Sequence, residues 1–214
     1  MADIQPNKME VIQLINSIYS SNSYILTLPE SEGCWLVDCG DVVKIEAWLK
    51  QHSKKLNGVL LTHTHYDHIY GLNELKQSHP ALRVFTSQNG IKSLYDDKYN
   101  FSRYHHVSFI YQWKDVEMLQ EGDRIELFAG FFLSVMETPG HDWSCLSYRM
   151  GHALFSGDSY IPGLRVVASF PKSNRKLAAI SLQRILSCVD DDTSIYAGHG
   201  EIYWMDKKNH ILKT

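Results

Sequence analysis

The sequence predicts a layered α/β sandwich, and two patterns carry that prediction. Short segments rich in Tyr, Ile, Trp, Val and Leu, bounded by Gly and Pro, alternate with segments whose apolar residues recur at helical spacing. Strands interleave with single helices in both halves of the chain, as layered α/β folds require. The sequence shows no internal repeat and no linker composition, so we expect a single domain over residues 1–214.

In the first half, two consecutive strands are followed by alternating helices and strands. Tyr, Ile, Trp and Val cluster in the strand-like runs, whereas the helical runs space their apolar residues three and four apart. The predicted strands are residues 22–29, 33–40, 57–62 and 81–87, and the predicted helices are residues 42–55 and 71–78.

The second half begins with consecutive strands. Residues 123–140, 144–150 and 152–158 predict antiparallel strands with tight turns at Gly130 and Gly151. The clearest helix of the chain follows at residues 173–189, with Ser173 or Asn174 as N-cap. Its predicted apolar face consists of Leu177, Ile180, Leu182, Ile185 and Leu186. A last strand is expected at residues 193–198.

Residues 88–118 fit neither period. The segment is aromatic, and its rings are Tyr95, Tyr99, Phe101, Tyr104, Phe109, Tyr111 and Trp113. Such a segment is either a flap over a pocket or a helix and loop whose rings fill the core. The sequence leaves both alternatives open.

Composition narrows the class of partner. The 21 basic residues nearly balance the 24 acidic ones, so we expect a small-molecule substrate and neither nucleic acid nor membrane as partner. The beginning of the chain lacks a secretory pattern and no stretch is apolar enough to span a membrane, which predicts a cytoplasmic protein. The four cysteines have no CxxC spacing and are expected to be reduced. The oligomeric state is open, a homodimer being possible.

The segment VLLTHTHYDHIYG, residues 59–71, concentrates four possible metal ligands behind an apolar strand. In an extended chain His63 and His65 project to the same side and can share one ion. Asp67 and His68 follow in the loop and point elsewhere, which suits a second ion. A lone histidine is usually an ordinary polar residue, but four ligands in six positions favour a metal site.

Three further candidate ligands follow strand-like segments. His141 lies in TPGH, Asp158 in SGD and His199 in AGHG, and each lies beside a glycine that permits a sharp turn. Zinc prefers imidazole nitrogen with some carboxylate oxygen, although iron and manganese accept the same ligands.

The motifs HTHYDH, TPGH, SGD and GHG, in this order, resemble those of the metallo-β-lactamase-fold hydrolase superfamily, and most closely its glyoxalase II-like branch. The resemblance covers about residues 20–200. It implies a four-layer αββα sandwich of two mixed β-sheets flanked by helices, with two Zn²⁺ ions at one edge of the sheets. It assigns His63, His65 and His141 to the first ion, Asp67, His68 and His199 to the second, and Asp158 to a bridging position.

The same resemblance implies roles beyond coordination. A hydroxide between the ions would be the nucleophile, and Asp67 would orient it or carry its proton. Asp38 would support the ligand histidines by hydrogen bonds, or would simply form a strand-end turn. Tyr160 would donate to a developing oxyanion, with packing as the alternative role. The basic group Arg165, Lys172, Arg175 and Lys176 either binds a substrate anion or forms a solvated helix end.

These expectations favour hydrolysis of a thioester, ester or lactone. Glyoxalase II enzymes carry a further helical region after the last ligand, whereas 15 residues follow His199 here, which argues against hydroxyacylglutathione as substrate. The β-lactamases usually lack the aspartate that matches Asp158, and the diiron flavoproteins commonly have glutamate at the position of His65. The remaining alternatives are a phosphodiesterase with the same two ions and an iron-dependent persulfide dioxygenase.

Overall fold

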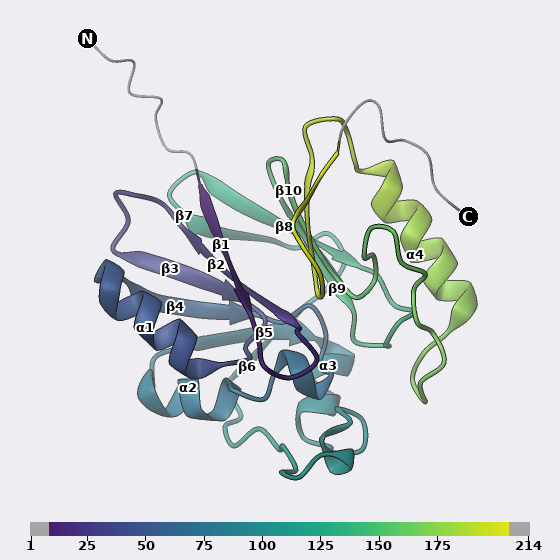
Figure 1. Ribbon diagram of the computed structural model, residues 1–214, viewed down its shortest axis with the longest axis horizontal. Coiled ribbons are helices and arrows are strands. Elements are labelled where there is room, and N and C mark those ends of the chain that lie inside the picture. Colours follow the sequence, from purple (N-terminus) through teal and green to yellow (C-terminus); the bar gives the residue numbers. More distant parts are fainter. Residues whose placement is uncertain (1–8, 206–214) are drawn as a thin grey trace.

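Two six-stranded sheets packed face to face, with helices on their outer surfaces, form the fold (Figure 1). This computed structural model describes residues 9–205. The arrangement confirms the predicted four-layer αββα sandwich. The predicted domain of residues 1–214 also includes residues 1–8 and 206–214, which lie outside the described residues.

The first sheet has the strand order β1-β2-β3-β4-β5-β6. Its first three strands pair antiparallel, and β3 to β6 pair parallel, which makes the sheet mixed. The strands are β1 Glu10–Ile15, β2 Asn22–Thr27, β3 Gly33–Val37, β4 Lys55–Leu60, β5 Arg83–Ser87 and β6 Val116–Leu119.

The second sheet has the order β12-β11-β10-β9-β8-β7. It is antiparallel except for the parallel pair of β10 and β11, so it is also mixed. The strands are β7 Arg124–Phe128, β8 Phe131–Glu137, β9 Leu146–Met150, β10 Ala153–Gly157, β11 Ser194–Ala197 and β12 Tyr203–Trp204.

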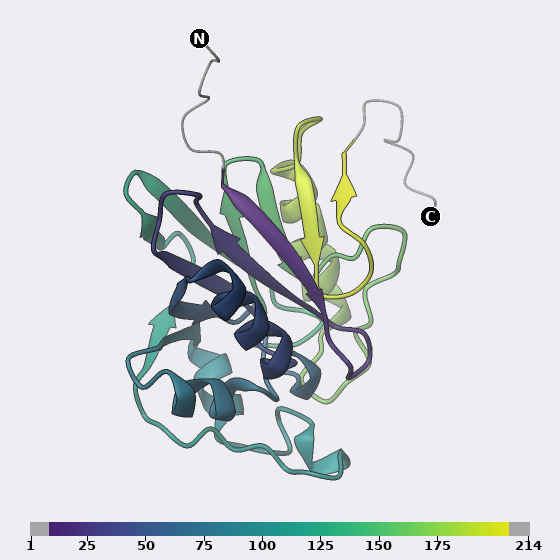
Figure 2. The ribbon, with the colours of Figure 1, turned by 60° about the vertical axis from the view of Figure 1, so that its left-hand side comes forward.

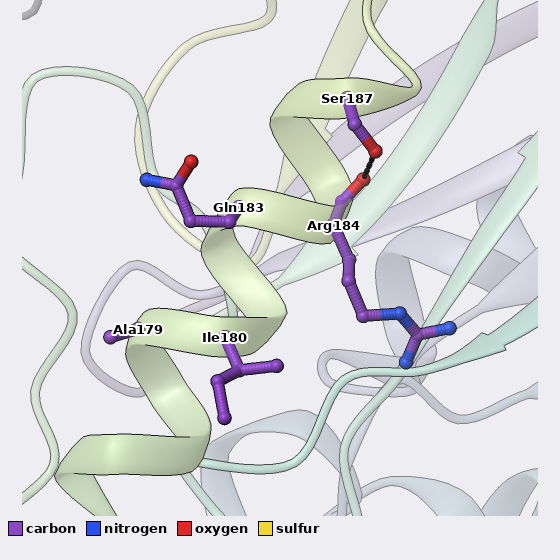
Figure 3. Close-up of a pocket in the computed structure, with 5 residues that line it drawn as sticks. All are labelled: Ala179, Ile180, Gln183, Arg184 and Ser187. Atoms are coloured by element: carbon purple, nitrogen blue, oxygen red, sulfur yellow. Dashed lines mark hydrogen bonds between the residues drawn. The ribbon is translucent and has the colours of Figure 1, made fainter.

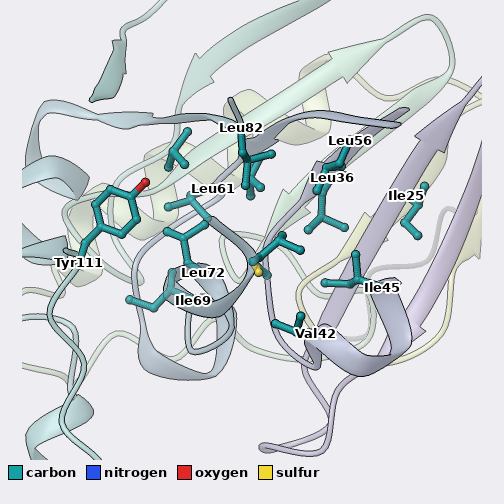
Figure 4. Packing of buried hydrophobic residues seen from close by; sticks show 14 of the residues in the cluster. Ile25, Leu36, Val42, Ile45, Leu56, Leu61, Ile69, Leu72, Leu82 and Tyr111 are labelled. Carbon is teal, nitrogen blue, oxygen red and sulfur yellow. The ribbon is translucent and has the colours of Figure 1, made fainter. Parts of the chain in front are cut away.

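Alternating side chains place each strand of the first sheet between two cores. In β2, Ile25 packs beneath the helices, whereas Tyr24 and Leu26 face the second sheet. The helix layer consists of α1 Val42–His52, α2 Leu72–Ser78 and α3 Gln88–Leu94. Figure 4 shows Val42 and Ile45 of α1 packed toward Leu36 of β3. Because both faces are covered, β2 is buried along its whole length.

The second sheet is covered by α4, Arg175–Ser187, whose N-cap is Asn174. The Asn174 side chain accepts hydrogen bonds from the backbone N–H groups of Lys176 and Leu177, at 3.0 and 3.1 Å. Ile185 is fully buried against Leu154 of β10 and Ile195 of β11. Figure 2 shows the two sheets between α1 on one side and α4 on the other. None of the helices within residues 9–205 combines the length and apolar character needed to cross a bilayer.

The apolar face predicted for α4 is partly wrong. Ile185, Leu182 and Leu186 pack on the sheet, but Leu177 and Ile180 are 40% and 56% exposed. The buried stripe uses Ala178 and Ser181 instead, because Ala178 packs closely against Gly140 and the Ser181 hydroxyl donates to the carbonyl of Pro139 at 2.7 Å. Ile180 instead lines a hollow on the outer surface of the helix with Ala179, Gln183, Arg184 and Ser187 (Figure 3).

Residues 88–118 contribute rings both to the core and to the surroundings of the histidine cluster, and a flap over a pocket stays a prediction. Phe109 and Tyr111 are buried in the core beneath the helix layer, as a packing segment requires. Phe101 lies at the histidine cluster, with its ring centroid 4.8 Å from that of His65. The strands β1, β6 and β12 have no counterpart in the sequence analysis, whereas α3 lies in the segment for which a helix was one alternative. All four cysteines are free, as expected.

Two isoleucines of α4 provide a test of this packing. Ile185→Ala should lower the free energy of unfolding by about 2–5 kcal/mol, because it empties a fully buried site. Ile180→Ala should change it by less than about 0.5 kcal/mol, because that side chain is mostly exposed. Urea unfolding followed by circular dichroism measures both. Equal losses would contradict this orientation of the helix.

Candidate metal centre

The candidate ligands gather where strands of both sheets end. Asp38 follows β3, and the histidine-rich loop follows the parallel neighbour β4. In the second sheet Asp158 follows β10 and His199 lies just beyond β11, which runs parallel to it. Backbone hydrogen bonds from Leu146 to Thr62 and from Asn22 to Gly198 join the two sheets at this edge. Carboxyl ends of parallel strands are the usual position of a functional site in an α/β sheet.

The first ligand group is His63, His65 and His141. One ring nitrogen of each lies within 4.8 Å of the others. Nε2 of His141 is 3.0 Å from Nδ1 of His65, and both rings are buried. This is the set that the sequence assigned to the first ion.

The second ligand group is Asp67, His68 and His199, again with ligand atoms within 4.8 Å of one another. Oδ2 of Asp67 lies 3.3 Å from Nε2 of His68 and 3.3 Å from Nε2 of His199. Asp67 and His68 belong to one short 3₁₀ turn, Tyr66–His68, so the turn aims both side chains at the same point.

Asp158 lies between the two groups. Its Oδ2 is 3.4 Å from Nε2 of His141 in the first group and 3.5 Å from Nε2 of His199 in the second. Its Oδ1 is 3.7 Å from Nε2 of His68. A carboxylate in contact with both groups has the position that a bridging ligand needs.

Hydrogen bonds on the outer side of the rings fix which nitrogen faces inward. Nδ1 of His141 donates to the carbonyl of Val167 at 2.8 Å, and Nδ1 of His199 donates to the carbonyl of Tyr19 at 3.1 Å. Since a carbonyl only accepts, both rings carry a proton on Nδ1, and Nε2 is the atom that faces the site. Such outer partners orient metal-binding histidines.

Asp38 fixes His68 and His63 in the same way. Its carboxylate accepts from Nδ1 of His68 at 3.0 Å and from the backbone and hydroxyl of Thr62, both at 2.7 Å. The Thr62 hydroxyl, having donated to Asp38, can only accept from Nδ1 of His63, which lies 3.1 Å away. Asp38 therefore supports two ligand histidines.

Asp142 is a residue that the sequence analysis missed. Its Oδ2 lies 3.5 Å from Nε2 of His65, and its Oδ1 accepts from the backbone N–H of Ser144 at 2.8 Å and from the Ser144 hydroxyl. A proton on Nε2 of His65 leaves Nδ1, the atom that faces His141, as the ligand atom. The only sequence signal was the acidic residue directly after His141.

These inward atoms fit metal ions. Nε2 of His63, Nε2 of His68 and Oδ1 of Asp158 are buried without a hydrogen-bond partner. Buried polar atoms rarely stay unpaired, and lone pairs that converge repel one another unless a cation lies between them. The two three-ligand groups with Asp158 between them match the donor set of a dinuclear site.

Charge at the site also favours cations. Burial alone would lower the pKa of His199, but the carboxylates of Asp158 and Asp67 raise it to about 9. Burial alone would raise the pKa of Asp158, but contact with His199 and other imidazoles lowers it to about 2. Burial among other imidazoles lowers the pKa of His63 well below its ordinary value. The carboxylates are therefore anionic and stabilise positive charge at the second group.

Two glycines give the ligands room. A Cβ on Gly198 would lie 2.0 Å from Oδ1 of Asp158, so no larger residue fits beside the bridging carboxylate. Gly140 has φ +148 and packs against the backbone of Ala178 at the start of α4, which brings His141 up to the cluster.

Tyr160 has the packing role that the sequence left as its alternative. Its ring is buried with Leu154, Ile185 and Ile195 beneath α4, and burial raises the pKa of its phenol. Among the contacts of residues 9–205, none joins Tyr160 to a ligand histidine. The contacts therefore do not support Tyr160 as an oxyanion donor.

The basic group is not gathered at the site. The ammonium of Lys172 lies over the rings of Tyr99 and Trp143, 4.4 and 4.3 Å from their centroids. Arg165, Arg175 and Lys176 are exposed, the last two at the start of α4. Binding of a substrate anion by these residues stays a prediction.

Comparison with known proteins decides the family. The sequence pattern of the metallo-beta-lactamase superfamily matches residues 17–200, which include all seven ligands. The chain belongs to the metallo-beta-lactamase superfamily. A hydroxyacylglutathione hydrolase of Hahella chejuensis is 32% identical over 186 residues, which are 84% of this chain and 62% of that protein. A probable metallo-hydrolase of Streptococcus pyogenes is 26% identical and covers 90% of this chain and 84% of its own length.

Solved structures of this superfamily share the fold. The B3 metallo-beta-lactamase BLEG-1 superposes with a TM-score of 0.81 at 23% identity, covering 91% of this chain and 93% of its own. TTHA1623, crystallised in a di-iron-bound form, gives 0.77 at 27% identity and covers 91% of this chain and 95% of its own. The chain spans about 62% of the length of several hydroxyacylglutathione hydrolases that it matches.

Removal of the bridging carboxylate tests the dinuclear arrangement. Asp158→Ala should lower bound metal and turnover together, because Asp158 contacts both ligand groups. Elemental analysis of purified protein and a turnover assay measure the two effects. Full activity with unchanged metal content would remove the bridging assignment.

Asp142→Asn tests the newly found support of His65. The asparagine amide has the shape of the carboxylate and keeps an oxygen that can accept from Ser144. Its NH₂ group, in place of the second oxygen, cannot accept a hydrogen bond from Nε2 of His65. Metal affinity should fall about 10- to 100-fold, the usual effect of losing an outer partner, and a competition titration with a chromophoric chelator measures it. Asp190→Asn, at an exposed carboxylate that binds Thr193, is the control. Equal affinities in both variants would exclude this role.

Proposed function

We propose that the chain is a metal-dependent hydrolase that cleaves a thioester, ester or lactone of a small molecule. The observation that carries the proposal is the pair of three-ligand groups with the Asp158 carboxylate between them. The hydroxyacylglutathione hydrolases among the relatives support a thioester substrate, and all seven predicted ligands lie in one cluster.

The ions, when bound, would supply Lewis acidity for the attacked carbonyl and would lower the pKa of water at neutral pH. The side chains of the protein would position the two ions. His63, His65 and His141 would hold one ion and Asp67, His68 and His199 the other. Asp158 fixes the spacing of the two groups, since it contacts both.

Asp67 has a second role in this proposal. It is ionised, because His68 and His199 lower its pKa despite its burial. With one oxygen between these two imidazoles, the carboxylate can orient the attacking water and accept its proton. The short turn that carries Asp67 keeps it in place, because Ser21 donates to its backbone carbonyl at 2.7 Å.

Zinc is the metal that we propose for both positions. Five imidazoles and two carboxylates form the donor set, which suits zinc, iron and manganese. The di-iron-bound form of TTHA1623 keeps iron as the competing choice. The experiment therefore compares the three metals directly.

The test starts from protein that has been stripped with a chelator and reloaded with Zn²⁺, Fe²⁺ or Mn²⁺. Thioester, lactone and phosphodiester substrates are then compared under each metal. We expect no turnover in the stripped protein and the highest kcat/KM for a thioester or ester with Zn²⁺.

Two outcomes would replace the proposal. Faster turnover of a bis-aryl phosphate than of any thioester would assign the site to a phosphodiesterase. Oxygen uptake with a glutathione persulfide, at one ferrous ion per chain, would assign it to a persulfide dioxygenase.

A further inference from the structure

Three loops border the metal centre, and each of them carries a large apolar side chain. The loop after β1 supplies the carbonyl of Tyr19 to His199. The loop after β10 supplies the carbonyl of Val167 to His141 and also carries Phe170. The loop after α3 places the ring of Phe101 against His65. The surroundings of the ligand groups are therefore aromatic on several sides.

Phe101 and Phe170 form an aromatic pair on the first ligand group. Their ring centroids are 5.4 Å apart. The ring of Phe101 is 4.8 Å from that of His65, and the ring of Phe170 is 5.5 Å from His65 and 5.8 Å from His141. An apolar group bound at the first ion would contact both rings.

The backbone holds Phe101 in this position at a cost. Phe101 has φ 62, in the left-handed region that residues other than glycine rarely adopt. Its neighbours are fixed: the side chain of Asn100 donates to the carbonyls of Ser93 and Phe109, and Ser102 donates from its backbone to Asn100. Both neighbours are fully buried. Strain of this kind persists where the surroundings enforce it, often at functional sites.

Lys172 connects the two loops that carry the pair. It lies two residues after Phe170, and its ammonium sits over Tyr99, two residues before Phe101. The same ammonium lies over Trp143, two residues after His141. These cation–π contacts hold the aromatic pair beside the ligands.

Several apolar side chains near the ligand groups are exposed and could contact a ligand. Phe170 is 42% exposed, Val167 50%, Tyr19 70% and Tyr104, whose ring lies 6.3 Å from Phe101, 69%. Exposed apolar side chains beside polar ligands often mark a binding surface. Under the proposed function the reacting carbonyl would lie at the ions that the ligand histidines hold, so the rings would take a group attached to that carbonyl.

We propose that Phe101 and Phe170 form an acyl-binding surface, which makes the hydrolase selective for thioesters or esters with an apolar acyl chain. This inference rests on the proposed function, which supplies the reaction. It concerns the acyl side of the scissile bond and leaves the thiol or alcohol side open.

A series of acyl groups on one thiol tests the inference. With zinc-loaded protein, kcat/KM should rise roughly 2- to 4-fold for each methylene added between the acetyl and hexanoyl thioesters, as expected for partial to full burial of a CH₂ group. Phe170→Ala should lower the hexanoyl-to-acetyl ratio of kcat/KM at least about 5-fold, mainly through KM. Bound metal is measured in parallel and should stay at the level of the unchanged protein.

Phe132→Ala is the matched control. Phe132 is also 42% exposed, but it lies on β8 and contacts Arg124. It should leave the hexanoyl-to-acetyl ratio unchanged. A Phe170→Ala variant that loses activity equally on all acyl groups would overturn the acyl-binding role.

Two results separate the inference from the function on which it rests. Equal kcat/KM for all acyl lengths in the unchanged protein would overturn the acyl-binding surface and leave the hydrolase intact. Absence of turnover for every thioester and ester, with metal bound, would overturn the proposed function itself.

Discussion

Convergence of buried lone pairs on two points is the constraint on which the rest of the structure depends. Five imidazoles and the carboxylates of Asp67 and Asp158 meet at the strand ends, and several of their inward atoms have no hydrogen-bond partner within residues 9–205. Such an arrangement costs free energy in the folded protein until cations satisfy it. Outer hydrogen bonds to Asp38, Tyr19 and Val167 hold three of the rings in this unfavourable arrangement, and the carboxylate of Asp142 lies 3.5 Å from the ring of His65.

The sandwich supplies the rigidity for that arrangement. Parallel neighbours in each sheet end at the same edge, and both sheets contribute ligands, so neither sheet alone could form the site. The apolar layer between the sheets and the backbone bonds that cross from one to the other fix their relative position. The contact between the two sheets is tightly packed at Gly198, because a methyl group there would collide with Asp158.

Much of this was predictable from the sequence, because ligand chemistry and strand-end position are both local signals. A metal site was predicted from the cluster of His63, His65, Asp67 and His68 and from the ligands beside glycines. The alternation of strand-like and helical segments predicted a layered α/β sandwich. Tertiary contacts decided the rest. Asp142 became recognisable only once folding brought it to His65, a residue 77 positions earlier. Tyr160 packs beneath α4, and Ala178 rather than Ile180 is buried, because Ala178 packs closely against Gly140.

Diffraction at the absorption edge of the bound metal tests the central claim most directly. The account predicts two anomalous peaks per chain, one among His63, His65 and His141 and one among Asp67, His68 and His199, with the Asp158 carboxylate between them. A single peak, or a peak coordinated by other residues, would contradict it.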